Sequence, residues 1–181
     1  PEAPHTLVLL LARPLVVDDT TQHNRLEVTV FRADSALCPE GKMVFTVRLT
    51  AHCRFWTSLR DADPARYHAE KHRSLQEVLA ILDARFPGLA RHVEATDVAT
   101  PATFVRWTSN WQGSFQGWLP TPRILGRPFQ FVLPGLNDFY MAGHWVVPGG
   151  GLPSAVLAAR YVAQLICARD GKTFAATAPL P

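Results

Sequence analysis

Three consecutive glycines, Gly149, Gly150 and Gly151, stand between a short apolar segment and a long helical pattern. We predict a buried strand over residues 139–142, a tight turn over residues 148–151 and a helix over residues 152–169. Glycines leave backbone N–H groups uncovered, and a helix N-terminus carries about half a positive charge. This arrangement suits a phosphate or an electron-rich carbonyl. A strand–helix turn that binds nothing would also favour glycines, so the residues alone leave both interpretations open.

The same turn reads Gly149-x-Gly151-x-x-Ser154, which is close to the GxGxxG fingerprint of dinucleotide-binding folds. That fingerprint opens a βαβ unit and requires a second strand with an acidic residue. Only a short polar and alanine-rich tail follows the predicted helix. We therefore exclude the dinucleotide fingerprint at this position.

A second group of interest is aromatic and comprises Trp107, Trp111, Phe115 and Trp118. Three of them lie in residues 110–135, a stretch that is rich in glycine and proline and has almost no periodicity, which predicts a long loop. Flat apolar side chains could form the walls of a site for a hydrophobic substrate. They could equally bury large areas and close the core under the loop.

The remaining reactive side chains favour structural roles. His68 and His72 are four residues apart on one predicted helix face, a spacing that can bind a metal ion, but no third ligand is placed. Both continue a leucine stripe, so we predict partly buried structural histidines and no metal site. Asp61 and Asp63 are interpreted as helix caps and Cys53 as core filling. No motif such as GxSxG supports a nucleophile, and the catalytic residues stay unassigned.

Four segments taken together carry a family resemblance. They are Thr100-Pro-Ala-Thr-Phe104, Trp111-Gln-Gly-Ser-Phe-Gln-Gly-Trp118, Pro134-Gly-Leu-Asn-Asp-Phe-Tyr-Met-Ala-Gly143 and Pro148-Gly-Gly-Gly-Leu-Pro-Ser-Ala155. This part of the chain resembles the C-terminal part of phytoene desaturases and carotenoid isomerases, which are FAD-dependent flavoproteins of the amine-oxidase-like superfamily. The resemblance is specific over residues 100–168. Over residues 1–99 only the order of three strands and a helix agrees with the family's substrate domain.

The resemblance implies roles for individual residues. Gly143 and His144 would contact the ribityl chain or a phosphate of FAD, although many members of the family carry an acidic residue where this chain has His144. A histidine can still donate a hydrogen bond there. The edge of the flavin ring would lie against Gly150, Gly151, Leu152 and Pro153. The family also uses the aromatic segment near the flavin, which makes Trp111, Phe115 and Trp118 candidate substrate-binding residues.

The resemblance further implies that the parent protein is an FAD-dependent oxidoreductase. It would desaturate or isomerise a hydrophobic, isoprenoid- or carotenoid-like substrate by hydride transfer to the flavin. The alternative is a non-enzymatic module that keeps the fold and binds a hydrophobic ligand or a protein partner.

The family's N-terminal GxGxxG segment has no counterpart in residues 1–100, and the chain opens on Pro1. We therefore expect a C-terminal fragment, with a substrate-domain-like region over residues 1–132 and the end of the FAD-binding domain over residues 133–181. Its partner would be the N-terminal nucleotide-binding part of the same parent chain. Alone, the fragment should be inactive and bind FAD weakly.

The helices and strands that we predict around the candidate site residues together indicate an α+β fold. Strands are predicted over residues 5–12, 26–32 and 43–51, and their short connections favour an antiparallel sheet. A long helix over residues 64–85 should pack on it, followed by a strand over residues 92–99. Thr100 and Pro101 then open another helix. The strand, glycine turn and helix described above complete the chain.

Composition limits the remaining function classes. The 181 residues are 48% hydrophobic and 18% charged, which excludes disorder over most of the length. The net charge of +3 is carried by scattered arginines, which argues against nucleic-acid binding. Three cysteines without a CxxC pair favour a reducing cytoplasm.

The longest apolar stretch, residues 7–17, is broken by Arg13 and Pro14, and a membrane span needs about 20 apolar residues. We therefore predict no span and no signal peptide, while peripheral membrane contact stays open. An apolar surface left without its partner domain should also cause self-association.

Overall fold

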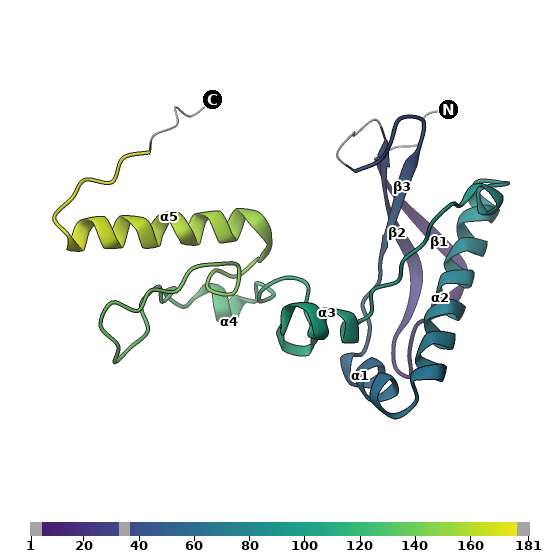
Figure 1. Cartoon of the computed structure of the whole chain (residues 1–181), viewed down its shortest axis with the longest axis horizontal. Helices are drawn as coiled ribbons and strands as arrows, with labels where there is room; N and C mark the ends of the chain where they lie inside the picture. The colour runs from purple at the N-terminus through teal and green to yellow at the C-terminus, as the bar shows by residue number, and fades with distance from the viewer. Residues whose placement is uncertain (1–4, 33–36, 177–181) are drawn as a thin grey trace. The chain divides into compact units, whose positions relative to one another are not determined.

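The computed structural model describes residues 5–32 and 37–176 and shows two compact units, Pro1–Gly113 and Ser114–Pro181 (Figure 1). The α+β fold predicted from the sequence is confirmed, with an antiparallel sheet, a long helix packed on it and further helices. The boundary between these units lies between residues 113 and 114. The predicted boundary after residue 132, between the substrate-domain-like region and the end of the FAD-binding domain, stays a prediction.

The first unit is built on a three-stranded antiparallel sheet of order β1-β2-β3, with β1 (Thr6–Val16), β2 (Gln22–Arg32) and β3 (Met43–Arg48). Alternate residues of β2 face one side, where Leu26, Val28 and Val30 are almost completely buried. The register of β1 on β2 shifts between Leu10 and Leu15, a stretch that contains Pro14. Proline has no N–H for the ladder, which accounts for the irregularity there.

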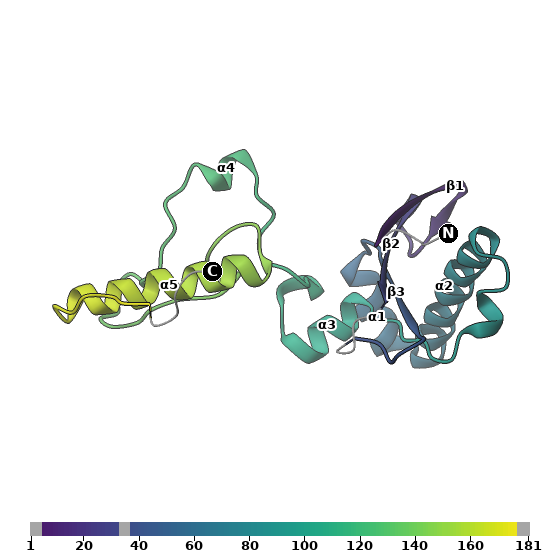
Figure 2. The same ribbon diagram turned by 90° about the horizontal axis from the view of Figure 1, so that it is seen from above.

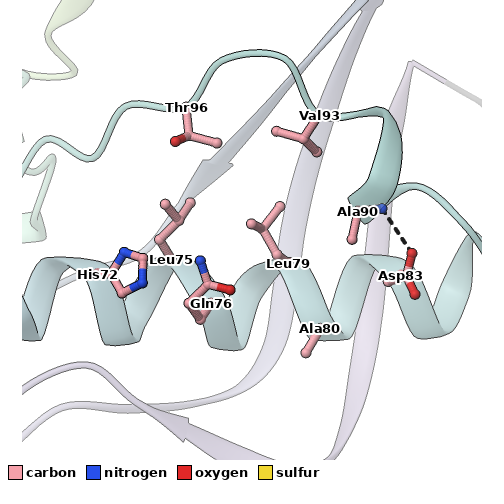
Figure 3. A pocket seen from close by; sticks show the side chains of 9 residues that line it. All are labelled: His72, Leu75, Gln76, Leu79, Ala80, Asp83, Ala90, Val93 and Thr96. Atoms are coloured by element: carbon pink, nitrogen blue, oxygen red, sulfur yellow. Dashed lines mark hydrogen bonds between the residues drawn. The ribbon is translucent and has the colours of Figure 1, made fainter.

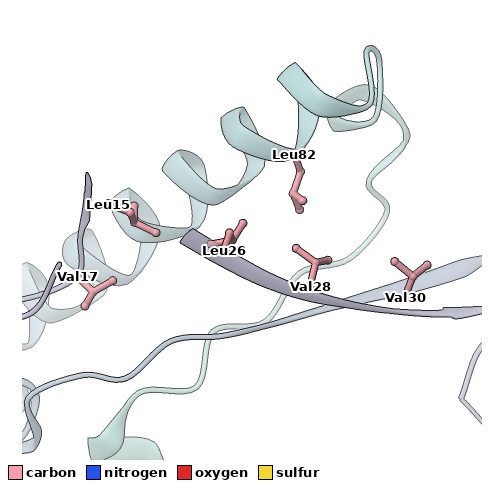
Figure 4. Packing of buried hydrophobic residues seen from close by; sticks show 6 residues of the cluster. All are labelled: Leu15, Val17, Leu26, Val28, Val30 and Leu82. Carbon is pink, nitrogen blue, oxygen red and sulfur yellow. The ribbon is translucent and has the colours of Figure 1, made fainter. Parts of the chain in front are cut away.

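The long helix α2 (Pro64–Arg85) covers this buried face, as both views of the unit show (Figures 1 and 2). Its predicted bounds are confirmed. Asp63 accepts a hydrogen bond from the N–H of Arg66 at 3.0 Å, and Pro64 occupies the first turn. The core cluster joins the helix to strands β1 and β2 and to the residue after β1, and consists of Leu15, Val17, Leu26, Val28, Val30 and Leu82 (Figure 4).

The buried face of α2 runs through Tyr67, Ser74 and Leu82. His68 and His72 lie outside it and are exposed, so their predicted partial burial is wrong. The leucine stripe used for that prediction, which includes Leu75 and Leu79, is only half-buried.

The first unit contains two further helices, which contact each other. The helix α1 (Cys53–Ala62) was not predicted, whereas α3 (Pro101–Thr108) begins at Thr100 and Pro101 as expected. They share a second core cluster formed by Trp56, Leu59, Tyr67 and Ala102. The predicted strand over residues 92–99 is wrong: the short 3-10 helix η1 (Ala90–His92) precedes an extended segment that joins no sheet.

Asp18 fixes the turn between β1 and β2 and the start of α1. Its side chain, in a residue only 6% exposed, accepts hydrogen bonds from the backbone N–H groups of Thr20, Thr21 and His52 at 3.0, 2.6 and 2.5 Å. Burial by itself would raise the pKa of Asp18, but these hydrogen bonds favour the carboxylate and lower the pKa below its ordinary value. A buried carboxylate thus links residues that are 34 positions apart in the sequence.

The second unit is mostly irregular and contains α4 (Pro122–Leu125) and the long α5 (Gly151–Arg169). The predicted strand over residues 139–142 is reduced to a narrow hairpin, in which Val132 and Tyr140 form an isolated bridge. The hairpin lies against the helix, because the rings of Phe131 and Tyr161 are 5.5 Å apart.

The apolar side chains of α5 are largely uncovered in the described part of the chain. Ala158 is its only buried residue, and Leu152 and Val156 are 81% and 67% exposed. By length and composition alone α5 is a candidate membrane span, and among the described residues no other helix passes that test. The prediction of no membrane span rested on residues 7–17 and did not consider this helix. Core helices of soluble proteins pass the same test, although they are mostly buried, whereas 6% of this stretch is buried.

Candidate functional site

The glycine turn at the start of α5 has a backbone conformation, with positive φ angles, that residues other than glycine rarely adopt. Gly149, Gly150 and Gly151 have φ angles of +103°, +61° and +76°, and Gly143 on the approach to the turn has φ +118°. The turn itself is therefore confirmed, and α5 starts at Gly151, one residue before its predicted start.

A distant segment, residues 116–118, is packed directly onto this turn. A Cβ added to Gly117 would overlap the carbonyl oxygen of His144. A Cβ added to Gly150 would meet the backbone nitrogen of Gly117 at 2.6 Å and the side chain of Gln116 at 3.1 Å. Gly117 and Gly150 are thus required by a close crossing of two backbones. Within the turn, the absence of a side chain at Gly150 has a packing explanation that involves no ligand.

Trp118 holds the same crossing through three contacts. Its backbone oxygen accepts a hydrogen bond from the N–H of Gly149 at 3.0 Å. Its Nε1–H donates to the backbone oxygen of Trp145 at 3.1 Å, and the two indole rings meet edge to face with centroids 5.3 Å apart. The predicted substrate-binding residue Trp118 therefore has structural contacts that the sequence did not indicate.

Other positions of the turn are open. A Cβ at Gly143 would meet no atom within 4 Å, and one at Gly151 would meet only ordinary contacts at 3.7 and 3.8 Å. The first N–H groups of a helix have no intrahelical acceptor, and α5 has neither a side-chain cap nor an acidic residue in its first turn. Pro153 has no N–H, so Gly151 and Leu152 are the donors at the helix start.

His144, which precedes the turn, carries an unpartnered polar atom. Its Nε2 is buried and has no hydrogen-bond partner in the protein. A buried nitrogen of this kind costs stability unless something binds it. The open N–H groups of the α5 start suit a ligand that presents electron-rich oxygens, such as a ribityl hydroxyl, a phosphate or a ring carbonyl, and an oxygen of this kind would also satisfy Nε2.

The far end of α5 is fixed by polar contacts. Arg169 pairs with Asp138, which has a φ of +62°. A hydrogen bond with Tyr140, and the charge of Asp138, raise the pKa of the Arg169 guanidinium. A cation at a helix C-terminus also interacts favourably with the helix dipole. The hairpin over residues 131–141 is thereby tied to the helix that begins at the glycine turn.

The structure brings together only some of the predicted site residues. His144 and Gly150 meet at the crossing with residues 116–118, while Leu152 and Pro153 are exposed at the start of α5. Phe115 and Trp118 belong to the second unit and are partly exposed, whereas Trp111 lies in η2 (Trp111–Gly113) of the first unit. The roles of these residues in binding stay predictions.

Gly117, Gln116 and Trp145 belong to this crossing but are not among the site residues predicted from the sequence. Gly117 lies in the glycine-rich stretch over residues 110–135, where a further glycine does not indicate a close approach of another backbone. Nothing in the spacing of residues 116–118 indicates that their partner lies near residue 144.

The first unit contains a separate open groove of about 540 Å³. Leu75 and Leu79 point from α2 toward the segment that carries Val93 and Thr96 (Figure 3). Asp83 closes one end by accepting a hydrogen bond from the N–H of Ala90 at 2.8 Å. None of the predicted site residues lines this groove.

Within residues 5–32 and 37–176, no three or more His, Cys, Asp or Glu side chains are grouped so that they could hold an ion. The three cysteines are unpaired.

Comparison with known proteins gives a family context. Over 142 residues the chain is 28% identical to the chloroplastic prolycopene isomerase of Arabidopsis thaliana, a match that covers 76% of this chain and 23% of that protein. Over 138 residues it is 28% identical to the neurosporene-forming phytoene desaturase of Cereibacter sphaeroides, covering 73% of this chain and 25% of that protein. The chain resembles carotenoid isomerases and desaturases.

That similarity supports the family resemblance described from the four sequence segments. The chain spans about a quarter of the length of these relatives: the match covers 23% of the prolycopene isomerase and 25% of the phytoene desaturase. No protein-family model and no solved structure matches the chain.

Proposed function

We propose that the protein containing this chain is an FAD-dependent oxidoreductase that desaturates or isomerises a hydrophobic, isoprenoid- or carotenoid-like substrate. The observation that carries the proposal is the similarity to a prolycopene isomerase over 142 residues. The open donors of the turn are compatible with it. Residues 133–181 would be the end of the FAD-binding domain and residues 1–132 part of the substrate domain.

In this proposal the chain's own residues bind and orient the cofactor. His144 Nε2 would donate a hydrogen bond to an oxygen of the ribityl chain or a phosphate, replacing the acidic residue of many family members. The N–H groups of Gly151 and Leu152 would face oxygen atoms at the edge of the ring. Bound FAD would supply the hydride acceptor for a substrate C–H bond. The exposed apolar surface of α5 would be covered by the N-terminal nucleotide-binding part of the same protein.

The first experiment uses the full-length protein in which this sequence occurs. Purified protein should be yellow, show the flavin absorption bands and release FAD on denaturation. His144→Ala should weaken FAD binding by about fivefold to tenfold, because one hydrogen bond to the cofactor is lost. The matched control is His72→Ala, which removes an exposed histidine of the first unit. Colourless wild-type protein that gains no flavin when FAD is added would contradict the proposal.

A second candidate function is a non-enzymatic module that binds a hydrophobic ligand or partner. The observation that favours it is the packing of Gly117 against Gly150, since that glycine is needed for the fold even without a cofactor. A colourless protein that changes the fluorescence of a retinoid on mixing would support this candidate. We retain a cytoplasmic or membrane-peripheral location as a prediction in either case.

A further inference from the structure

We propose that Gly117 and Trp118 are positioning residues of the flavin site, and that they set the conformation of the glycine turn that receives the cofactor. The inference rests on the proposed function. It assigns Trp118 a role different from the substrate wall suggested by its sequence context. The reasons are the contacts of residues 116–118 with residues 144–150, all of which lie within the second unit.

The first reason is the close approach of the two backbones. The carbonyl oxygen of His144 occupies the space where a side chain of Gly117 would start, and the nitrogen of Gly117 occupies the corresponding space of Gly150. Neither glycine can therefore carry a side chain while the two segments keep this close approach. Displacing residues 116–118 would move His144 and the turn together, because both contact Gly117.

The second reason is that Trp118 uses a different atom for each contact. Its backbone oxygen binds the Gly149 N–H, while its indole N–H binds the Trp145 oxygen. The two groups that they bind, at Trp145 and Gly149, lie between His144 and Gly150 in the sequence. They satisfy the Gly149 N–H internally and leave the N–H groups of Gly151 and Leu152 at the helix start for a ligand.

The hydrogen bond from Gly149 to Trp118 limits which groups of the turn can bind a ligand. Gly149 cannot contribute its N–H to a cofactor while Trp118 accepts it. His144 Nε2 and the α5 start are then the polar groups of this turn that remain for the flavin. Positioning by residues 116–118 would thus determine the direction from which the cofactor is bound, without these residues touching its reacting atoms.

The experiment uses the full-length protein and compares two glycine substitutions in the second unit. Gly117→Ala places a methyl group against the His144 carbonyl. Gly126→Ala is the matched control, since its added Cβ would meet only Pro122 at an ordinary 3.6 Å. Flavin dissociation constants are measured by fluorescence titration of the apoprotein. Gly117→Ala should bind FAD at least about tenfold more weakly, since a small displacement of positioned groups has large effects, and Gly126→Ala should bind as the wild type does.

A second variant avoids a steric clash altogether. Trp118→Phe keeps a ring beside Trp145 but removes the N–H donor, and it should weaken FAD binding by about threefold to tenfold. The flavin absorption spectrum of both variants should be shifted from that of the wild type, while far-UV circular dichroism is unchanged. A purely structural role would lower the melting temperature without altering the spectrum of the bound flavin.

The outcomes separate the two proposals. A wild-type protein that binds no flavin contradicts the proposed function and, with it, this inference. A wild-type protein that binds flavin, while Gly117→Ala and Trp118→Phe bind it with unchanged affinity and spectrum, overturns the positioning role alone. If Gly117→Ala does not fold, the folded Trp118→Phe protein decides between these results.

Discussion

At the scale of single residues, Asp18 connects pH with stability. Its carboxylate is stabilised in the folded state by the N–H groups of Thr20, Thr21 and His52, so its folded-state pKa lies below that in the unfolded chain. A group with a lowered folded-state pKa contributes stability above its unfolded-state pKa. That contribution is lost as the pH falls through the folded-state pKa.

We expect Asp18→Asn to lower the free energy of unfolding at neutral pH by about 1–3 kcal/mol, because charge-assisted hydrogen bonds are lost in a buried setting. Urea unfolding of both proteins should give curves that converge in acid, where the wild-type carboxylate is protonated. Asp97→Asn, at an exposed position, serves as the control and should be neutral. A difference that stays constant at all pH values would argue against this role of the charge.

Two glycines of the first unit separate backbone strain from steric overlap. Gly41 and Gly113 have similar φ angles of +74° and +64°. A Cβ at Gly41 would enter open space, whereas one at Gly113 would overlap the carbonyl oxygen of Pro101. We expect Gly41→Ala to cost about 1–2 kcal/mol from the left-handed backbone alone. Gly113→Ala should cost clearly more, and equal losses in thermal unfolding would contradict the packing of Gly113 on α3.

Some features of the site could be predicted from the sequence and others could not, depending on how far apart the residues involved are in the chain. The glycine turn is detectable because the conformation of three successive glycines is a local property. The packing of Gly117 on His144 depends on residues 27 positions apart, as does the bond from Trp118 to Trp145, and no local pattern encodes it. His144 was found through family resemblance, whereas its unpartnered Nε2 became visible only in the structure.

At the scale of elements, local signals predicted some helices to the residue and missed another. The bounds of α2 follow from Asp63 and Pro64 at its start and from Pro87 and Gly88 after its end. The start of α1 has no such signal: its N-cap is His52, whose side chain makes no capping hydrogen bond. Asp18, distant in sequence, accepts the His52 N–H instead.

Strand prediction failed where apolar segments have no partner strand in the described chain. The segment over residues 92–99 was predicted from its composition, but it runs beside α2 as an extended chain. Residues 139–142 pair only at one bridge. A strand is stabilised by its neighbours, so a period or a composition alone is insufficient to predict it.

The start of α3 offers a test at the same scale. Thr100 and Thr103 form a reciprocal capping box, and Thr100 Oγ1 is also hydrogen-bonded to the buried hydroxyl of Tyr67 at 2.9 Å. We expect Thr100→Ala to lower stability by about 1–2 kcal/mol through loss of the cap. A double-mutant cycle with Tyr67→Phe should show a coupling of about 0.5–1.5 kcal/mol. Thr100→Ser should retain most of the stability, and strictly additive losses would exclude the shared hydrogen bond.

At the scale of the whole molecule, the uncovered apolar side chains of α5 predict association. Apolar surface in contact with water favours burial by about 25 cal/mol per Å², and large exposed patches mark interaction surfaces. We expect the 181-residue chain to form higher-mass species as its concentration rises, as measured by light scattering. Replacing Leu152 and Val156 together by lysine should shift it toward the monomer.

The matched control for this prediction is Leu10→Lys, which changes an apolar residue of β1 that is 84% exposed. It should leave the association unchanged if α5 is the surface responsible. A monomeric mass at every concentration would contradict the prediction. So would equal effects of the substitutions in α5 and β1.

Asp63 is the only residue between α1 and α2. Its N–H donates to the oxygen of Leu59 at 2.9 Å and completes the end of one helix, while its side chain accepts from Arg66 and begins the next. One residue thus performs both tasks, and an inserted residue would separate them. During evolution this junction should therefore keep its length, and insertions or deletions should accumulate in the exposed stretch over residues 126–130 instead.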